Sequence, residues 1–217
     1  TSAVLMLVFK DTILGLAAGV RLTSNDMLHK GDWITVKSVD ANGIVEDMSL
    51  TTVKVRNFDN TIVTISPATL VNGSFQNWIG MQKSGGRRAK RIVYFDFRSI
   101  RLVDETLKQT LLAKHFATED SFKLKESLQK AIEKDIQEGK DIEDLKNPAA
   151  LAPTNLQLYR RFMEKYLRQR PEVNTELTLM VRHMEATQCG LPIEFYFFIK
   201  DKVWVNYEHI LADIMEH

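Results

Sequence analysis

The sequence predicts an α+β protein in which an amphipathic N-terminal helix leads into a small antiparallel β barrel and then into an α/β sandwich domain with a helical insertion. Three observations predict this class. Apolar residues recur at helical spacing over 12–28, runs rich in Val, Ile and Thr follow over 33–65, and strands and charged helical patterns alternate after residue 92. The content of 44% hydrophobic and 26% charged residues is ordinary for a folded protein.

The N-terminal segment begins with a seven-residue apolar run, Ala3 to Phe9. This run is far shorter than the roughly 20 residues that span a bilayer, and it lacks the basic flank and the cleavage site of a signal peptide. The pattern alone leaves two interpretations: a buried first helix or strand, or the end of a longer hydrophobic helix. Asp11 can serve as the N-cap of a helix that starts at Thr12, with Gly31 as its stop signal.

Small residues are concentrated within this predicted helix, at Gly15, Ala17, Ala18 and Gly19. A glycine inside a helix costs about 1 kcal/mol relative to alanine. Two glycines four residues apart therefore indicate that another backbone approaches the helix closely.

The β unit is predicted over 31–82. Its strands are WITVKSV, GIVEDMSLTTVKVR and NTIVTI, which are separated by DANG and FDN. Asn and Gly tolerate positive φ, so these separators are typical of hairpin turns. The segment LVNGSFQNW predicts one more short strand.

A basic segment over 83–91 follows and is predicted to be a linker. Its cations are Lys83, Arg87, Arg88, Lys90 and Arg91, beside two glycines. Such a cluster next to a small barrel can bind phosphates or nucleic acid. The net charge of +1 and the absence of an aromatic RNA-binding pattern favour a solvated linker.

The remainder, 92–217, predicts a sheet covered by helices on one side. IVYFDF begins it as a strand, charged amphipathic helices occupy 101–147, and NPAALAP is a break. The helix NLQLYRRFMEKYLRQR should end before Pro171, and two strands, ELTLMVRHMEA and LPIEFYFFIK, precede a final helix. We expect a mixed sheet here.

No pattern in the chain predicts catalysis. Glycine-rich phosphate loops, HExxH and GxSxG are absent, and the five histidines have no partner at metal-ligand spacing. Cys189 is the single cysteine, which excludes an intrachain disulfide. We therefore expect no enzyme activity, no catalytic residue, no metal and no cofactor.

The first helix and the β unit together resemble the small-conductance mechanosensitive channel (MscS) family. The resemblance rests on LGLAAGV at 14–20, GDWI at 31–34, GIVEDMSLTTVKVRNFDNTIVTI at 43–65 and NGSFQNW at 72–78. The segments NDMLHKGDWI, LTTVKVRNFDNTI and SGGRRAKR, and the later YLRQRPEV, LTLMVRHMEA and GLPIEFYFF, are similar to its miniconductance branch. Two departures are Pro67, one place later than in the family, and Asn60 in place of a turn glycine.

The resemblance implies four regions. Residues 1–30 are the end of a pore-lining helix and a kinked amphipathic helix, 31–82 an Sm-like β domain, 83–91 the basic linker, and 92–217 an α/β domain with a helical insertion at about 105–155.

The resemblance also implies roles for single residues. Ala3 and Leu7 match the apolar constriction of the pore, Asp11 and Thr12 fall at the helix kink, and Gly15, Ala18 and Gly19 allow close helix packing. The basic segment 83–91 lines the wall of a cytoplasmic cage or faces phospholipid head groups.

The implied function is that of a tension-gated channel subunit of the bacterial inner membrane, which protects the cell against hypoosmotic shock. This portion faces the cytoplasm, and its implied partners are six further copies in a heptamer, membrane lipid at the N-terminal helices, and permeating ions. No nucleic acid is expected as a partner. One alternative is a soluble Sm-like nucleic-acid-binding protein, whose affinity would fall steeply with salt. The other is a purely structural oligomerisation module with the same architecture.

Overall fold

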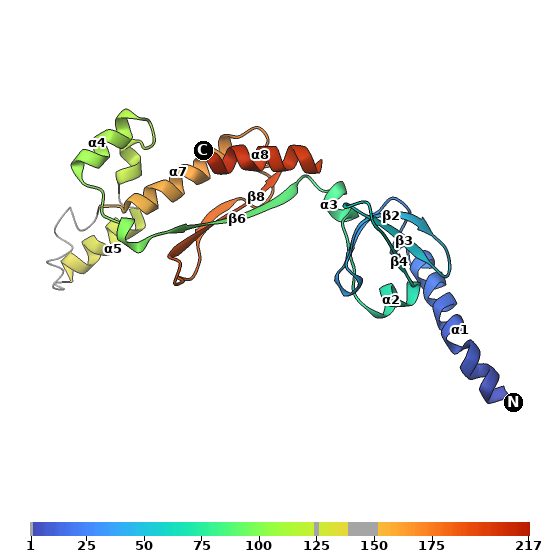
Figure 1. Cartoon of the computed structure of the whole chain (residues 1–217). Helices are drawn as coiled ribbons and strands as arrows, with labels where there is room; N and C mark the ends of the chain where they lie inside the picture. Colours follow the sequence, from blue (N-terminus) through green and yellow to red (C-terminus); the bar gives the residue numbers. More distant parts are fainter. Residues whose placement is uncertain (1, 124–125, 139–151) are drawn as a thin grey trace. The chain divides into compact units, whose positions relative to one another are not determined.

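The computed structural model describes residues 2–123, 126–138 and 152–217, and it divides into two compact units, Thr1–Ser84 and Gly85–His217 (Figure 1). Both units combine helices with antiparallel sheets, which confirms the predicted α+β class.

The first unit is a long helix followed by a five-stranded antiparallel sheet. Helix α1 (Ser2–Ser24) leads to a sheet in the order β4-β3-β2-β1-β5. The strands are β1 (Trp33–Val36), β2 (Ala41–Met48), β3 (Val53–Asn57), β4 (Ile62–Ile65) and β5 (Gln76–Asn77). The short helices are η1 (Lys37–Val39), α2 (Pro67–Asn72) and α3 (Ile79–Lys83).

The register of this sheet places alternate apolar residues on one buried face. Val45 pairs with Val55, and Val55 pairs with Val63 on the next strand. Asp40 and Asn60 adopt left-handed backbone conformations in the turns, as the DANG and FDN sequences predict. The core beneath comprises Leu22, Leu28, Ile34, Val36, Ala41, Val45, Val53, Val55, Ile65 and Leu70.

Three predictions for the first unit are wrong in detail. The segment GIVEDMSLTTVKVR is not one strand, because it contains most of β2 and of β3, which pair in opposite directions. Helix α1 runs without a break from Ser2 to Ser24, so it neither starts at Thr12 nor continues to Leu28. The segment LVNGSFQNW is not a single strand, because the end of α2 occupies its start and β5 occupies Gln76–Asn77. Ser66 begins α2 as its N-cap by accepting a hydrogen bond from the Thr69 amide, and Pro67 follows at the first helical position.

The second unit is a three-stranded antiparallel sheet in the order β6-β8-β7. The strands are β6 (Arg87–Phe95), β7 (Met180–His183) and β8 (Leu191–Ile199), and two of the helices are α7 (Asn155–Gln169) and α8 (Trp204–Glu216). The expected mixed sheet is wrong. A tight turn in which Gly190 has φ of 123° joins β7 to β8, so these two strands must run in opposite directions.

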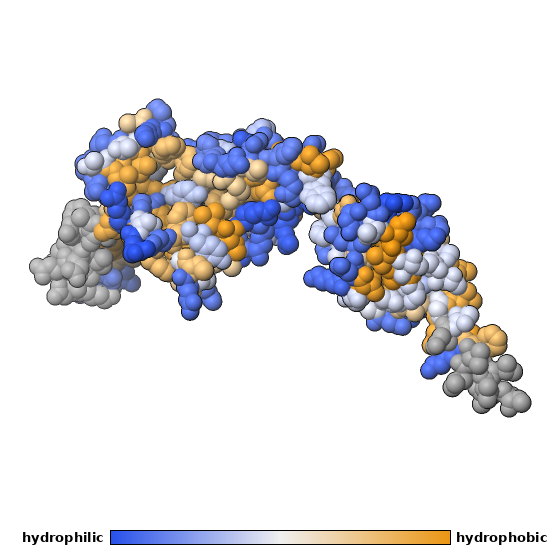
Figure 2. Space-filling view, viewed as in Figure 1, coloured by the Kyte–Doolittle hydropathy of each residue, from blue (hydrophilic) through white to orange (hydrophobic). Residues whose placement is uncertain are grey.

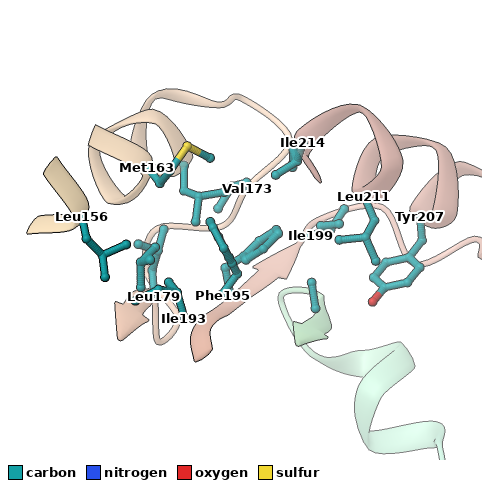
Figure 3. Close-up of a cluster of buried hydrophobic side chains, with 14 residues drawn as sticks. Leu156, Met163, Val173, Leu179, Ile193, Phe195, Ile199, Tyr207, Leu211 and Ile214 are labelled. Carbon is teal, nitrogen blue, oxygen red and sulfur yellow. The ribbon is translucent and has the colours of Figure 1, made fainter. Parts of the chain in front are cut away.

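The core of this unit lies between the sheet and two helices (Figure 3). Strand β8 is central, and its Ile193, Phe195, Phe197 and Ile199 are almost fully buried. Helix α7 ends at Gln169, before Pro171, as predicted. Helices α7 and α8 contribute six side chains to this core: Leu156, Met163, Leu167, Tyr207, Leu211 and Ile214.

The helical insertion contains α4 (Glu105–Ala113), η3 (Glu119–Phe122) and α5 (Glu126–Gln137), after the short η2 (Phe97–Ser99). Helical structure over this stretch was predicted. The expected break at NPAALAP lies largely outside the described residues.

The predicted linker is also wrong. Arg87, Arg88, Lys90 and Arg91 lie on strand β6, and only Lys83 lies outside it, at the end of α3. The linker was predicted because this segment is rich in basic residues. In the structure Ala89 is fully buried, while Arg88 and Lys90 project from the opposite face of the strand.

Candidate functional site

The junction between α1 and the sheet is the candidate functional site of the first unit. Gly19 faces the turn between β2 and β3, where the backbone of Leu50 lies against it. A Cβ atom built on Gly19 would lie 2.8 Å from the Leu50 carbonyl carbon and 2.9 Å from its Cα. Real Cβ atoms essentially never approach backbone so closely. Neighbouring Ala18 is 6% exposed. A larger side chain at Gly19 would therefore push the helix away from the sheet.

Gly15 has a different environment from Gly19. No atom lies within 4 Å of a Cβ built on Gly15, so this glycine makes no close contact with the described part of the chain. The large apolar side chains near it are solvent-exposed. They are Phe9, Ile13, Leu14, Leu16 and Val20. Figure 2 shows apolar surface along α1. Phe9, Ile13, Leu16 and Val20 share one side of the helix, and we call these four residues the open face of α1.

A buried carboxylate links two parts of the first unit that are distant in the sequence. Asp32 is 6% exposed. Its carboxylate accepts hydrogen bonds from the side-chain amide of Asn77 at 2.8 Å and from the backbone N–H of His29 at 3.1 Å. This contact joins the segments GDWI and QNW, which lie 45 residues apart. A buried carboxylate requires such donors to offset its lost hydration.

Aromatic stacking reinforces the same connection. The Trp33 and Trp78 rings stack at 4.6 Å with an interplanar angle of 18°, and Phe58 packs edge-on against Trp33 at 5.3 Å. The indole N–H of Trp78 donates to Thr35 Oγ1, and that of Trp33 donates to Asn42 Oδ1. Each indole therefore combines an apolar contact with a satisfied donor.

The basic residues of β6 contact groups within their own unit. Arg87 lies over the Tyr207 ring at 4.4 Å, and Arg88 lies 5.9 Å from the Tyr196 ring. Arg91 is 3.7 Å from a carboxylate oxygen of Glu208. Exposed pairs of this kind contribute little stability, so we assign these cations no specific role from their contacts alone.

Lys90 forms the most buried of these pairs. Its ammonium lies 3.2 Å from Glu194 Oε1, while Arg182 Nε donates to Glu194 Oε2 at 2.6 Å. Burial alone would raise the pKa of Glu194, but the hydrogen bond from Arg182 and the positive charges of Arg182 and Lys90 outweigh it and hold the pKa below its ordinary value. Sequence analysis missed Glu194. Its signal was a lone acid inside the apolar run LPIEFYFF.

The remaining predicted site residues lie on α1. The side chains of Ala3, Leu7 and Asp11 are outside the described part of the structure, and Thr12 is exposed. The backbone continues as helix through Asp11 and Thr12. Neither residue therefore starts a separate helix, and the predicted capping role of Asp11 is wrong. The pore-lining role of Ala3 and Leu7 stays a prediction.

The described residues contain neither a cluster of metal-binding side chains nor a membrane-spanning helix. Within 2–123, 126–138 and 152–217, no group of three or more His, Cys, Asp or Glu side chains is arranged to hold a metal ion. In the same residues, no helix combines the length and the apolar character needed to cross a bilayer.

The helix, the sheet and their junction define the class of protein. Residues 11–80 match the family described as "Mechanosensitive ion channel, beta-domain". The small-conductance mechanosensitive channel MscMJ of Methanocaldococcus jannaschii is 33% identical over 73 residues, which are 34% of this chain and 20% of that protein. An uncharacterized MscS family protein of Aquifex aeolicus is 35% identical over 86 residues, 40% of this chain and 21% of that protein.

Solved structures with the same fold extend the similarity to both units. The crystal structure of Helicobacter pylori MscS in a closed state superposes with a TM-score of 0.57 at 12% identity, over 99% of this chain and 62% of that one. The cryo-EM structure of Arabidopsis thaliana MSL1 gives a TM-score of 0.59 at 10% identity, over 99% and 57%. The chain therefore resembles the MscS family: residues 11–80 match the β domain, and the fold is that of the solved MscS and MSL1 structures. The chain spans about a fifth of the curated relatives it matches. The named relative from Methanocaldococcus jannaschii and the matched family are mechanosensitive channels rather than enzymes, in agreement with the prediction.

Proposed function

We propose that this chain is the cytoplasmic part of a mechanosensitive channel subunit that membrane tension opens and that protects bacteria against hypoosmotic shock. The observation that carries the proposal is the β unit. Its match over 11–80 includes both the junction helix and the sheet into which that helix is locked at Gly19.

The open face of α1 supports a membrane-associated role. Ile13 is 60% exposed and Val20 is 49% exposed, on a helix whose opposite side carries the buried Ala18 and Leu22. A helix with apolar residues on both sides requires a second apolar partner. Membrane lipid and neighbouring copies of α1 are the partners we propose.

Assembly into a ring would give the exposed edges of the sheet their contacts. The sheet of the first unit has two edge strands, β4 and β5, and Ile62 on β4 is 50% exposed. Exposed edges readily pair with a second chain, and a head-to-tail interface that closes forms a ring. We propose a homoheptamer in which these edges meet.

Rigidity at the junction provides the mechanism. Tension favours the state that occupies more area in the membrane, so helices upstream of α1 move outward. Because Gly19 lies directly on the Leu50 backbone, α1 moves as one body with its sheet over this contact. The ring of sheets keeps the subunits together while ions pass. The cations of β6 would contribute to the wall that the ions pass.

We propose that the protein is of the miniconductance branch. The segments NDMLHKGDWI and SGGRRAKR and the insertion that contains α4 and α5 support this proposal. The cytoplasmic face of the bacterial inner membrane is the proposed location.

Patch recording tests the proposal. The gene product that contains this chain should be expressed in bacteria that lack their own mechanosensitive channels. We expect a conductance that appears under suction and a higher survival after hypoosmotic shock. Membrane that stays silent up to rupture, with the protein present in it by immunoblot, would contradict the proposal.

A further inference from the structure

The helical insertion and α7 enclose a hollow that the channel proposal does not use. Its cavity volume is about 340 Å³, within the range of small-molecule sites. The segment 115–121, the side of α7 and His217 line it. A second hollow of about 260 Å³ shares Phe116, Leu158, Phe162 and His217 with the first, and is otherwise lined mainly by apolar residues.

Flat rings form much of the wall. The His217 ring is parallel to that of Tyr166, at 4.2 Å and 7°, and lies 6.3 Å from that of Phe162. Phe116 meets Phe162 edge-on at 5.3 Å. Walls of this kind favour a flat apolar body, which gains both area burial and ring stacking.

The charges on α7 are divided between two sides of the helix. Arg160 and Arg168 share the carboxylate of Glu164, at 3.6 and 3.1 Å. Arg161 and Lys165, one turn apart, line the hollow, and within the described residues no carboxylate forms an ion pair with either. Arg161 donates to the Ser121 carbonyl at 3.2 Å, which fixes the guanidinium at the wall.

Acidic side chains near the hollow are already paired elsewhere. Glu119 lies 3.5 Å from Lys108, and Asp120 lies 2.7 Å from Lys123. No Asp or Glu is among the described residues that line the hollow. The wall therefore has two cations without acidic partners in the described chain, beside a set of aromatic rings.

We infer that this hollow is a binding site for a small organic anion with a flat aromatic body. The ring system would lie against Phe162 and the outer side of the stacked pair formed by Tyr166 and His217, and the anionic group would face Arg161 and Lys165. The inference concerns the second unit alone and does not depend on channel activity.

The fluorescent anion 8-anilinonaphthalene-1-sulfonate is a suitable probe, and N-phenyl-1-naphthylamine is its neutral counterpart without the sulfonate. The purified 217-residue chain should bind the anion more tightly than the neutral probe. The variant K165Q should weaken anion binding about threefold to tenfold and leave the neutral probe unaffected. Phe162→Leu should weaken both probes.

The matched control is R168Q, which removes the same charge from α7 outside the hollow. It should bind both probes like the wild type. The open face of α1 can also take up these dyes, so only the component of binding that Phe162→Leu removes counts as this site. Lys165 is exposed, so K165Q should keep the fold, which far-UV circular dichroism checks. Equal affinity for the two probes, or equal effects of K165Q and R168Q on the anion, would overturn the inference.

Discussion

The α-carbon of Gly19 lies directly on the backbone of Leu50, so that the turn between β2 and β3 occupies the space where a side chain would project from α1. This contact fixes one helix face to the sheet. The same helix carries a second glycine, Gly15, with open space around it. The two positions thus form an internal comparison between a glycine that the folded chain requires and one that it does not.

Gly19→Ala should lower the free energy of unfolding by about 1–3 kcal/mol, because the new methyl group overlaps backbone that cannot move aside. Gly15→Ala should raise it by about 0.5–1 kcal/mol, because alanine is the better helix former and meets nothing. Urea unfolding of the isolated chain measures both. Equal effects of the two substitutions would show that the Leu50 contact does not constrain the helix.

Gly15→Ala also distinguishes the monomer from the assembled channel. If neighbouring helices pack against Gly15 in the proposed ring, the added methyl group should disturb that contact while leaving the isolated chain stable. We expect the suction needed to open the channel to change in patch recordings. An unchanged threshold would place Gly15 outside the subunit interface.

Asp32 and Asn77 should be energetically coupled. Each single substitution to alanine removes one partner of a largely buried hydrogen bond, and the double variant removes both. We expect a coupling energy of about 1–3 kcal/mol in a double-mutant cycle of urea unfolding. Simple additivity would mean that the contact does not stabilise the link between GDWI and QNW.

Glu194 should make stability depend on pH in the acidic range. The folded-state pKa is lower than the unfolded value of about 4.5, so its stabilising contribution is complete above that value and is lost as the pH falls through the lowered folded-state pKa. Glu194→Gln should cost about 1–3 kcal/mol at neutral pH and should flatten this part of the pH profile. Thermal unfolding between pH 7 and the acid limit of the fold, about pH 3, measures both effects. Parallel profiles for wild type and variant would contradict this role.

Elements whose determinants lie within their own segment were predicted from the sequence, and elements that depend on distant contacts were not. The helix Asn155–Gln169 was predicted because its apolar period and Pro171 lie within the segment itself. The first five residues of β6, Arg87–Arg91, were predicted to be a linker because four of them are basic, whereas IVYFDF, which contains the rest of the strand, was predicted correctly. The partners of β6, such as Glu194 on β8, lie about a hundred residues later in the chain. No local pattern shows such a contact.

The candidate site shows the same limit. Two glycines in one helix predicted a close approach of backbone, yet the sequence could not name Leu50 as the partner or distinguish Gly19 from Gly15. Asp32 and Asn77 each belong to a segment quoted for the family resemblance, but their hydrogen bond depends on the pairing of β1 with β5. The sequence could not predict this hydrogen bond, because it forms only when the sheet brings β1 and β5 together.

A single substitution on the edge strand β4 tests whether this edge takes part in assembly. Ile62→Lys places a charge on the strand proposed to meet the next subunit, and charged edges resist pairing. We expect this variant to fold and to lose the oligomer. Gln188→Lys, which adds the same charge to the turn between β7 and β8, is the control and should assemble like the wild type. Retention of the oligomer by Ile62→Lys would exclude the β4 edge from the interface.

The measurement that tests the central claim most directly is the mass of the purified chain by multi-angle light scattering over a range of concentrations. The account predicts a particle seven times the mass of the 24.9 kDa monomer, which the cage-forming part of an MscS-family channel would form. A monomer at every concentration would contradict it.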